Sequence, residues 1–93
     1  MTNAEIAAVF SDIAVRLRLK KGENIFKIRA YEKVAASILE LQEPVAKLAA
    51  EGRLKEIPGA GDAIVKKLTE LVATGRLAFY EKLKAEGPVA APG

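Results

Sequence analysis

Residues 54–68 read LKEIPGAGDAIVKKL, and this stretch decides the fold. Proline and glycine at 58–61 are typical of a tight turn. The segment before them, 53–57, is long enough for one packed helical turn. After them, the apolar residues of 62–74 recur at spacings of three and four, as on one face of a helix, and Gly75 follows as a stop signal. The stretch therefore predicts a short helical turn, a hairpin and a longer helix.

Helical periodicity continues on both sides of this stretch. Thr2 and Glu5 have the spacing of a capping box, and the helix that they begin ends in a run of cations before Gly22. Asn24 can cap a second helix that runs to about residue 41. Pro44 precedes a short third helix at 45–51, and a last helix is expected at 77–85.

The same periodicity predicts which side chains face the core. The first helix contributes one apolar face, the second helix another, and the helix at 62–74 an apolar stripe. The last helix is expected to bury Phe79, Tyr80 or Leu83. The three faces comprise Ile6, Val9, Phe10, Ile13 and Leu17; Ile28, Tyr31, Ala35, Ile38 and Leu39; and Ile64, Val65, Leu68, Leu71 and Val72.

The fold class follows from these segments and from the length of the chain. Ninety-three residues form one small domain, and they show neither strand-like alternation nor an internal repeat. We expect an all-α, compact bundle of four to five short helices containing one helix-hairpin-helix motif. Residues 1–86 form this domain, and 87–93, rich in proline, glycine and alanine, are a flexible tail or the start of a linker.

Composition excludes several classes of function. The chain has no cysteine and no histidine, so disulfides, zinc sites built on these residues and nucleophiles paired with histidine are excluded. No apolar run approaches the roughly 20 residues needed to span a bilayer, and acidic residues interrupt the N-terminal apolar positions, unlike a signal peptide. We expect a cytoplasmic protein that makes no membrane contact.

Cations are concentrated in one part of the chain. The overall charge is only +3, from 15 Lys and Arg against 12 Asp and Glu. Between residues 16 and 33, however, seven cations face two acids, a surplus of five. Such a cluster is a footprint for a polyanion. A solvated basic surface that maintains solubility is the alternative. The seven are Arg16, Arg18, Lys20, Lys21, Lys27, Arg29 and Lys33.

The hairpin has the features of a phosphate-binding loop. Gly59 and Gly61 allow close approach, and the backbone N–H groups of residues 59, 61 and 62 lie at a helix N-terminus, which favours an anion. Lys55, Lys66 and Lys67 add positive charge, whereas Asp62 would compete with a phosphate. Because phosphate contacts ignore base edges, such a loop predicts binding without sequence preference. The alternative is that the glycines only make a tight interhelical turn.

Two longer segments carry a resemblance to a known family. They are NIFKIRAYEKVAASI at 24–38 and LKEIPGAGDAIVKKL at 54–68, followed by ATGRL at 73–77. From about residue 3 to residue 86 the chain resembles the N-terminal helix-hairpin-helix, lyase-type domain of X-family DNA polymerases, which includes DNA polymerase beta and its bacterial relatives. The resemblance implies non-specific binding to gapped or nicked DNA in base excision repair. It also implies either that polymerase domains follow in a longer parent chain or that the chain is a freestanding relative, and that the protein is associated with the bacterial nucleoid.

The resemblance implies a catalytic group and a set of phosphate contacts. Lys67 corresponds to the lysine that forms a Schiff base in 5′-deoxyribose phosphate lyases, with Lys27 and Tyr31 supporting it. On a helical wheel of residues 62–74, Lys67 lies at the flank of the apolar stripe. Partial desolvation at this position favours the neutral amine. The alternatives are a lysine that lays its stem along the core edge and a tyrosine that belongs to the core. The implied phosphate contacts are Gly59, Ala60, Gly61, Lys55, Lys66, Lys67, Lys27, Arg29 and Lys33.

The resemblance further implies a Na⁺ or K⁺ ion at the hairpin, held by the backbone carbonyls of Lys55, Ile57 and Ala60, and no required cofactor. Three positions depart from the family pattern: Phe26 replaces a histidine that contacts the phosphate, Ala63 replaces a lysine and Glu32 replaces an arginine.

Clustered carboxylates for a polymerase Mg²⁺ site are missing from the chain. We expect a monomer, with three functions to distinguish: DNA binding alone, DNA binding with lyase activity, and protein interaction without nucleic acid.

Overall fold

The computed structural model describes residues 1–86, and within them it contains five α-helices, one 3-10 turn and no strand. The predicted all-α bundle is therefore confirmed, while the predicted tail at 87–93 lies outside the described residues. The elements are α1 (Asn3–Leu19), α2 (Ile25–Glu40), α3 (Val45–Ala50), η1 (Leu54–Glu56), α4 (Asp62–Thr74) and α5 (Ala78–Ala85).

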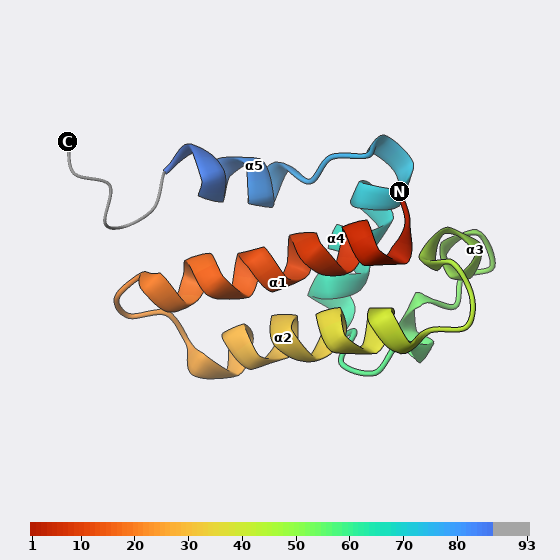
Figure 1. Ribbon diagram of the computed structural model, residues 1–93, viewed down its shortest axis with the longest axis horizontal. Helices are drawn as coiled ribbons and strands as arrows, with labels where there is room; N and C mark the ends of the chain where they lie inside the picture. The colour runs from red at the N-terminus through yellow and green to blue at the C-terminus, as the bar shows by residue number, and fades with distance from the viewer. Residues whose placement is uncertain (87–93) are drawn as a thin grey trace.

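The two longest helices, α1 and α2, run antiparallel and form the most extensive helix pair (Figure 1). α5 lies along the other side of α1, and α3 lies at one end of the pair (Figure 1). The chain returns through η1 to α4, which passes behind α1 in this view. In residues 1–86, no helix is both long and apolar enough to cross a membrane.

The core is built from the faces that the periodicity predicts. Phe10 and Ile13 of α1, Ile38 of α2 and Leu68 of α4 are fully buried, and all described elements contribute to one apolar cluster. One prediction was wrong: Leu39 is 65% exposed. A step of one residue turns a helix by about 100°. With Ile38 directed into the core, Leu39 is turned out to the edge of a shallow groove beside α1.

Local signals fix the helix ends close to their predicted positions. Thr2 and Glu5 make both bonds of the capping box, and the Asn24 side chain accepts the Phe26 N–H at 2.8 Å. Gly75 ends α4 in the left-handed conformation, at φ 75°. The N-cap of α4 is different, because Gly61 has no side chain with which to cap the first turn.

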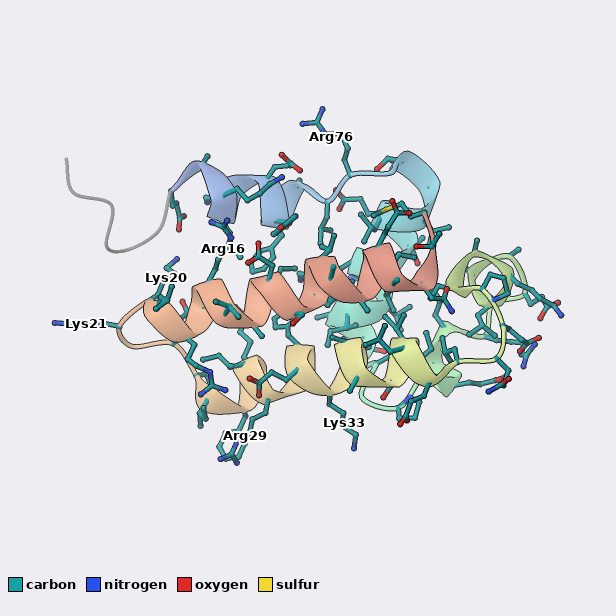
Figure 2. The ribbon with its side chains drawn as sticks, viewed as in Figure 1. Arg16, Lys20, Lys21, Arg29, Lys33 and Arg76 are labelled. Carbon is teal, nitrogen blue, oxygen red and sulfur yellow. The ribbon has the colours of Figure 1, made fainter. Side chains whose placement is uncertain are left out.

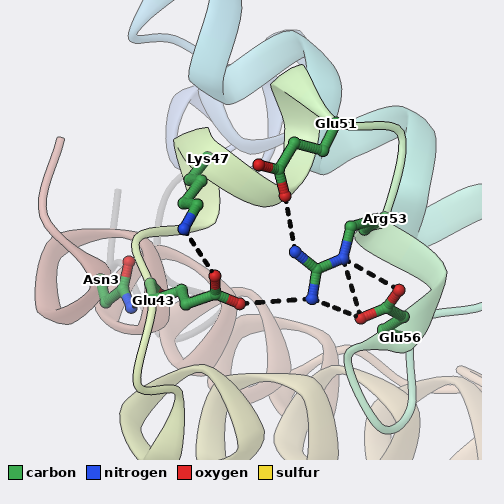
Figure 3. A network of polar contacts seen from close by, with 6 residues as sticks. All are labelled: Asn3, Glu43, Lys47, Glu51, Arg53 and Glu56. Atoms are coloured by element: carbon green, nitrogen blue, oxygen red, sulfur yellow. Dashed lines mark hydrogen bonds and ion pairs between the residues drawn. The ribbon is translucent and has the colours of Figure 1, made fainter.

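An ion-pair network holds the segment before the hairpin (Figure 3). The Arg53 guanidinium contacts three carboxylates, with Nη2 at 3.3 Å from Glu43 and 2.9 Å from Glu56, and Nη1 bound to Glu51. Glu43 also pairs with Lys47 at 2.9 Å. These contacts join η1, α3 and the loop before α3. The network therefore holds in place the residues that lead into the hairpin.

Candidate nucleic-acid interface

The hairpin is a tight turn that packs against α2. The Ala60 N–H donates to the Ile57 carbonyl at 3.0 Å, and the Gly61 N–H donates to the Gly59 carbonyl at 3.1 Å. Gly59 has φ 92°, and a Cβ built on it would lie 3.0 Å from Cγ of Lys33. Position 59 therefore requires glycine both for its backbone conformation and for its contact with the Lys33 stem.

The N–H groups available to a ligand differ from those predicted. The Gly61 N–H is used inside the turn, because the chain closes tightly around Ala60. The Ala60 N–H is also used, so this residue offers a phosphate no backbone donor. The N–H groups of Gly59 and of the first three residues of α4, Asp62–Ile64, have no acceptor within residues 1–86. An anion at this helix N-terminus would find these four donors.

A cavity of about 500 Å³ lies between α2, the hairpin and α4, and we call it the hairpin pocket. It brings together the three residues for which catalytic roles were predicted, Lys27, Tyr31 and Lys67, with both hairpin glycines. Small side chains at 30 and 63 leave it open. The full lining is Lys27, Ala30, Tyr31, Gly59, Gly61, Asp62, Ala63, Ile64 and Lys67.

Phe79 of α5 lies under the two lysines of the hairpin pocket. The Lys67 Nζ is 4.8 Å and the Lys27 Nζ 5.5 Å from the centre of its ring, both within cation–π range. The Phe79 ring in turn stacks on Tyr31, with centroids 6.1 Å apart. Helical periodicity predicts Phe79 only as a core residue. No local signal links it to lysines that lie 12 and 52 positions earlier in the chain.

The pocket shifts the protonation of two of its side chains. Burial, and then the positive charge of Lys27, lower the pKa of Lys67, so the neutral amine is more accessible than in a solvated lysine. Burial, and then the charge of Glu23, raise the pKa of Tyr31 to about 12. The Tyr31 hydroxyl therefore keeps its proton at neutral pH and can donate a hydrogen bond. Tyr31 is at once a core residue, 3% exposed, and a wall of the pocket.

Ion pairs reduce the cationic surplus that the sequence suggests. Of the seven cations between residues 16 and 33, four have acidic partners. At the hairpin, Lys55 pairs with Asp62 at 2.7 Å, so the positive charge of Lys55 and the negative charge of Asp62 offset each other. The cations without an acidic partner in the described part of the chain are Lys21, Arg29, Lys33, Lys66, Lys67 and Lys82.

Two of these unpaired cations lie on the outer face of α2. Figure 2 shows Arg29 and Lys33 pointing away from the bundle, on the side of α2 opposite α1. Lys33 adjoins the hairpin through its contact with Gly59, and Lys67 lines the hairpin pocket. Lys66 is exposed on α4. Cations without an acidic partner in the described residues therefore border the hairpin on both α2 and α4.

The chemistry of the hairpin carbonyls fits a hard monovalent cation. In a continuing 3-10 helix the Lys55 carbonyl would accept the N–H of residue 58, but Pro58 has none. The Ile57 carbonyl accepts one N–H and keeps a second lone pair. The Ala60 carbonyl accepts no backbone N–H within residues 1–86. That part of the chain has no cluster of three or more acidic, cysteine or histidine side chains that could bind a metal.

The sequence model of a family described as a helix-hairpin-helix domain matches residues 1–77, which include α1 to α4 and the whole hairpin. No curated protein matches the chain in sequence.

Proposed function

This chain belongs to the helix-hairpin-helix domain family, and we propose that it binds the phosphate backbone of DNA at gaps or nicks, without sequence preference. Family membership favours nucleic-acid binding in general. The observation that supports the finer proposal is the position of the unpaired donors of the hairpin. They lie beside Lys33 and Lys67, two cations without acidic partners in residues 1–86.

Phosphate oxygens suit both kinds of group at this surface. The free N–H groups at the start of α4 can donate to one phosphate, as helix N-termini commonly do. Arg29 and Lys33, one turn apart on α2, can neutralise its neighbours along the same strand. None of these contacts reads a base edge, so affinity depends on the backbone and on salt.

The preference for gaps or nicks rests on the hairpin pocket. A cavity of about 500 Å³ lined by two lysines and two glycines accepts the end of a strand, with its terminal phosphate, better than a continuous duplex. The resemblance to X-family polymerase domains, which bind the 5′-phosphate side of a gap, supports the same preference.

A binding experiment tests this proposal with a matched control. Affinity is measured by fluorescence anisotropy for a gapped duplex with a 5′-phosphate and for the intact duplex. Replacing Arg29 and Lys33 by glutamine removes two unpaired charges and should lower the salt slope of binding by about 2. The control replaces Lys47 and Lys84, whose charges are paired with glutamates elsewhere.

We expect tighter binding to the gapped duplex and a large loss of affinity only in the first double variant. Equal loss in the two double variants would show that affinity follows net charge rather than this surface. Equal affinity of the wild-type protein for both duplexes would contradict the preference for gaps. Absence of DNA binding would leave protein interaction as the function.

A second function, 5′-deoxyribose phosphate lyase activity, is favoured by the lowered pKa of Lys67 in the hairpin pocket. The neutral Nζ adds to the C1′ aldehyde of the ring-opened sugar, and loss of water gives an iminium ion. Removal of a C2′ proton then breaks the C3′–O3′ bond, which releases the downstream strand with its 5′-phosphate. Water hydrolyses the imine and frees the lysine. The sequence of steps requires no oxidant.

Borohydride trapping tests the lyase proposal. The substrate is a gapped duplex that carries a 5′-deoxyribose phosphate, and the comparison is between Lys67→Ala and Lys66→Ala. Lys66 is the matched control because it is the neighbouring, exposed lysine of α4. A covalent adduct in the wild-type protein and in Lys66→Ala, but not in Lys67→Ala, supports the assignment. An adduct that persists in Lys67→Ala contradicts it.

We also propose that Na⁺ or K⁺ binds the carbonyls of Lys55, Ile57 and Ala60 when DNA is bound or when the salt concentration is high. An ion that binds only the folded state raises the melting temperature. Melting in KCl is compared with melting in tetramethylammonium chloride at equal ionic strength, since the larger cation cannot enter the turn. Equal melting temperatures would contradict the proposal.

A further inference from the structure

Phe26 is the most exposed large apolar side chain in the described residues, at 74%. The other two phenylalanines, Phe10 and Phe79, are in the core or packed against it. Its backbone is fixed, because the Phe26 N–H donates to the cap residue Asn24 at 2.8 Å. The ring is thus presented to solvent from the rigid first turn of α2. Single exposed apolar residues are common on protein surfaces, so its surroundings decide what this ring does.

The surroundings of Phe26 are those of the candidate interface. Phe26, Ala30 and Lys33 are spaced by four and three residues, so they share one face of α2. On this face the Lys33 stem contacts Gly59, and Ala30 lines the hairpin pocket. Phe26 therefore lies about 10 Å along the helix axis from the point where the hairpin packs. Arg29, without an acidic partner in residues 1–86, lies between them in the chain.

We propose that Phe26 is a stacking platform for an unpaired base of the DNA strand whose phosphates lie on the hairpin and α2. The inference rests on the proposed function and names the part of the DNA that this surface selects. A flat apolar ring bordered by unpaired cations matches single-stranded nucleic acid, which offers base faces along a chain of negative charge. An acidic protein would satisfy the cations but would not require an aromatic face.

This platform distinguishes single strands from duplex. In a continuous duplex both faces of each base are covered by neighbouring bases, whereas the bases of a gap are exposed. Every base has a π-face, so stacking favours a gap without selecting its sequence. Phe26 would therefore contribute affinity for gapped or single-stranded DNA and none for intact duplex.

A tryptophan at position 26 reports stacking directly. The chain contains no tryptophan, so Phe26→Trp introduces a single indole fluorophore at an exposed site where the larger ring fits. Stacking on a base quenches indole emission. We expect strong quenching by a single-stranded oligonucleotide with a 5′-phosphate. An abasic oligonucleotide of equal length has the same phosphates and should bind with little quenching. Equal quenching by both would overturn the inference.

Affinities supply an independent test with a matched control. Phe26→Leu keeps an apolar side chain but removes the π-face, and loss of one stacked base weakens binding by roughly 5- to 150-fold. We expect this loss for the gapped duplex and the single strand, and no loss for intact duplex. Leu39→Ala is the control, because Leu39 is 65% exposed on the same helix but borders the groove beside α1. It should leave all three affinities unchanged.

The outcomes separate this inference from the proposed function. If the wild-type protein binds gapped DNA with salt dependence but Phe26→Leu binds equally well, the stacking platform is wrong and phosphate binding stands. If Phe26→Leu weakens binding to gapped and intact duplex alike, the side chain has no selectivity for unpaired bases and the inference also fails. If the wild-type protein binds no DNA, both proposals fail.

Discussion

Gly61→Ser should stabilise the protein and weaken its binding to DNA. Gly61 is the N-cap of α4, and its φ of −78° and ψ of 179° are open to any residue. Apart from residues 60–62 themselves, no atom in residues 1–86 lies within 4 Å of a Cβ built there. A serine hydroxyl at an N-cap accepts the N–H of the second or third helical residue, here Ala63 or Ile64. These are two of the free donors that we assign to a phosphate.

The two effects have opposite signs and different sizes. Serine is preferred over glycine at an N-cap by a few tenths of a kcal/mol. For a domain of this length, the melting temperature should therefore rise by roughly 1 to 3 °C. A phosphate can take back this donor only if the serine gives up its cap bond, which costs about 0.5–2 kcal/mol. DNA binding should therefore weaken by roughly 2- to 30-fold.

Thermal melting followed by circular dichroism measures the first effect, and fluorescence anisotropy with the gapped duplex measures the second. Pro44→Ser is the control, because Pro44 is the exposed N-cap of α3 and also lacks a side-chain cap bond. It should leave DNA affinity unchanged. If Gly61→Ser binds DNA as tightly as the wild-type protein, the start of α4 does not hold the phosphate and our reasoning is refuted.

Three further predictions follow from individual contacts. Gly59→Ala should lower the free energy of unfolding in urea by about 1–2 kcal/mol because of its positive φ, and the contact of the new Cβ with the Lys33 stem should lower it further. Gly22 also has a positive φ but lies in open space, so Gly22→Ala should show only the cost of the backbone conformation. Lys67, with its lowered pKa, should react with an amine-specific reagent near neutral pH faster than the other lysines, as peptide mapping would show; an equal rate contradicts a desolvated amine. Arg53→Gln should lower the melting temperature and flatten its decline in acid. The Arg53 guanidinium lowers the pKa of Glu56 below 4.5 in the folded state, so this stabilisation is present above pH 4.5 and is lost as the pH falls through the lowered value. If the melting temperature of the variant declined in acid as steeply as that of the wild-type protein, the Arg53–Glu56 pair would not be its cause.

Much of the fold could be predicted because its signals are local. The predicted bounds of α4, 62–74, match the structure residue for residue, since a proline-glycine turn precedes the helix and Gly75 ends it. The capping box at Thr2 and the cap at Asn24 likewise depend on residues two or three positions apart. Periodicity then placed Lys67 at the edge of the apolar stripe of α4, where the structure has it partly buried.

The parts that could not be predicted depend on the tertiary structure. Lys20 pairs with Glu86, which lies 66 positions later and outside the basic segment, so this segment is less cationic than its composition indicates. Phe79 reaches Lys67 only because α5 folds back along α1. The Gly61 N–H donates to the Gly59 carbonyl inside the turn, and residue propensities do not predict this hydrogen bond. These three differences change which groups a ligand can contact, although none of them changes the fold.

The dependence of DNA affinity on salt tests the central claim most directly. If the hairpin and the unpaired cations around it neutralise three to four phosphates, a plot of log K against log[salt] for the gapped duplex should have a slope of about −3. A slope near zero would contradict binding to the phosphate backbone.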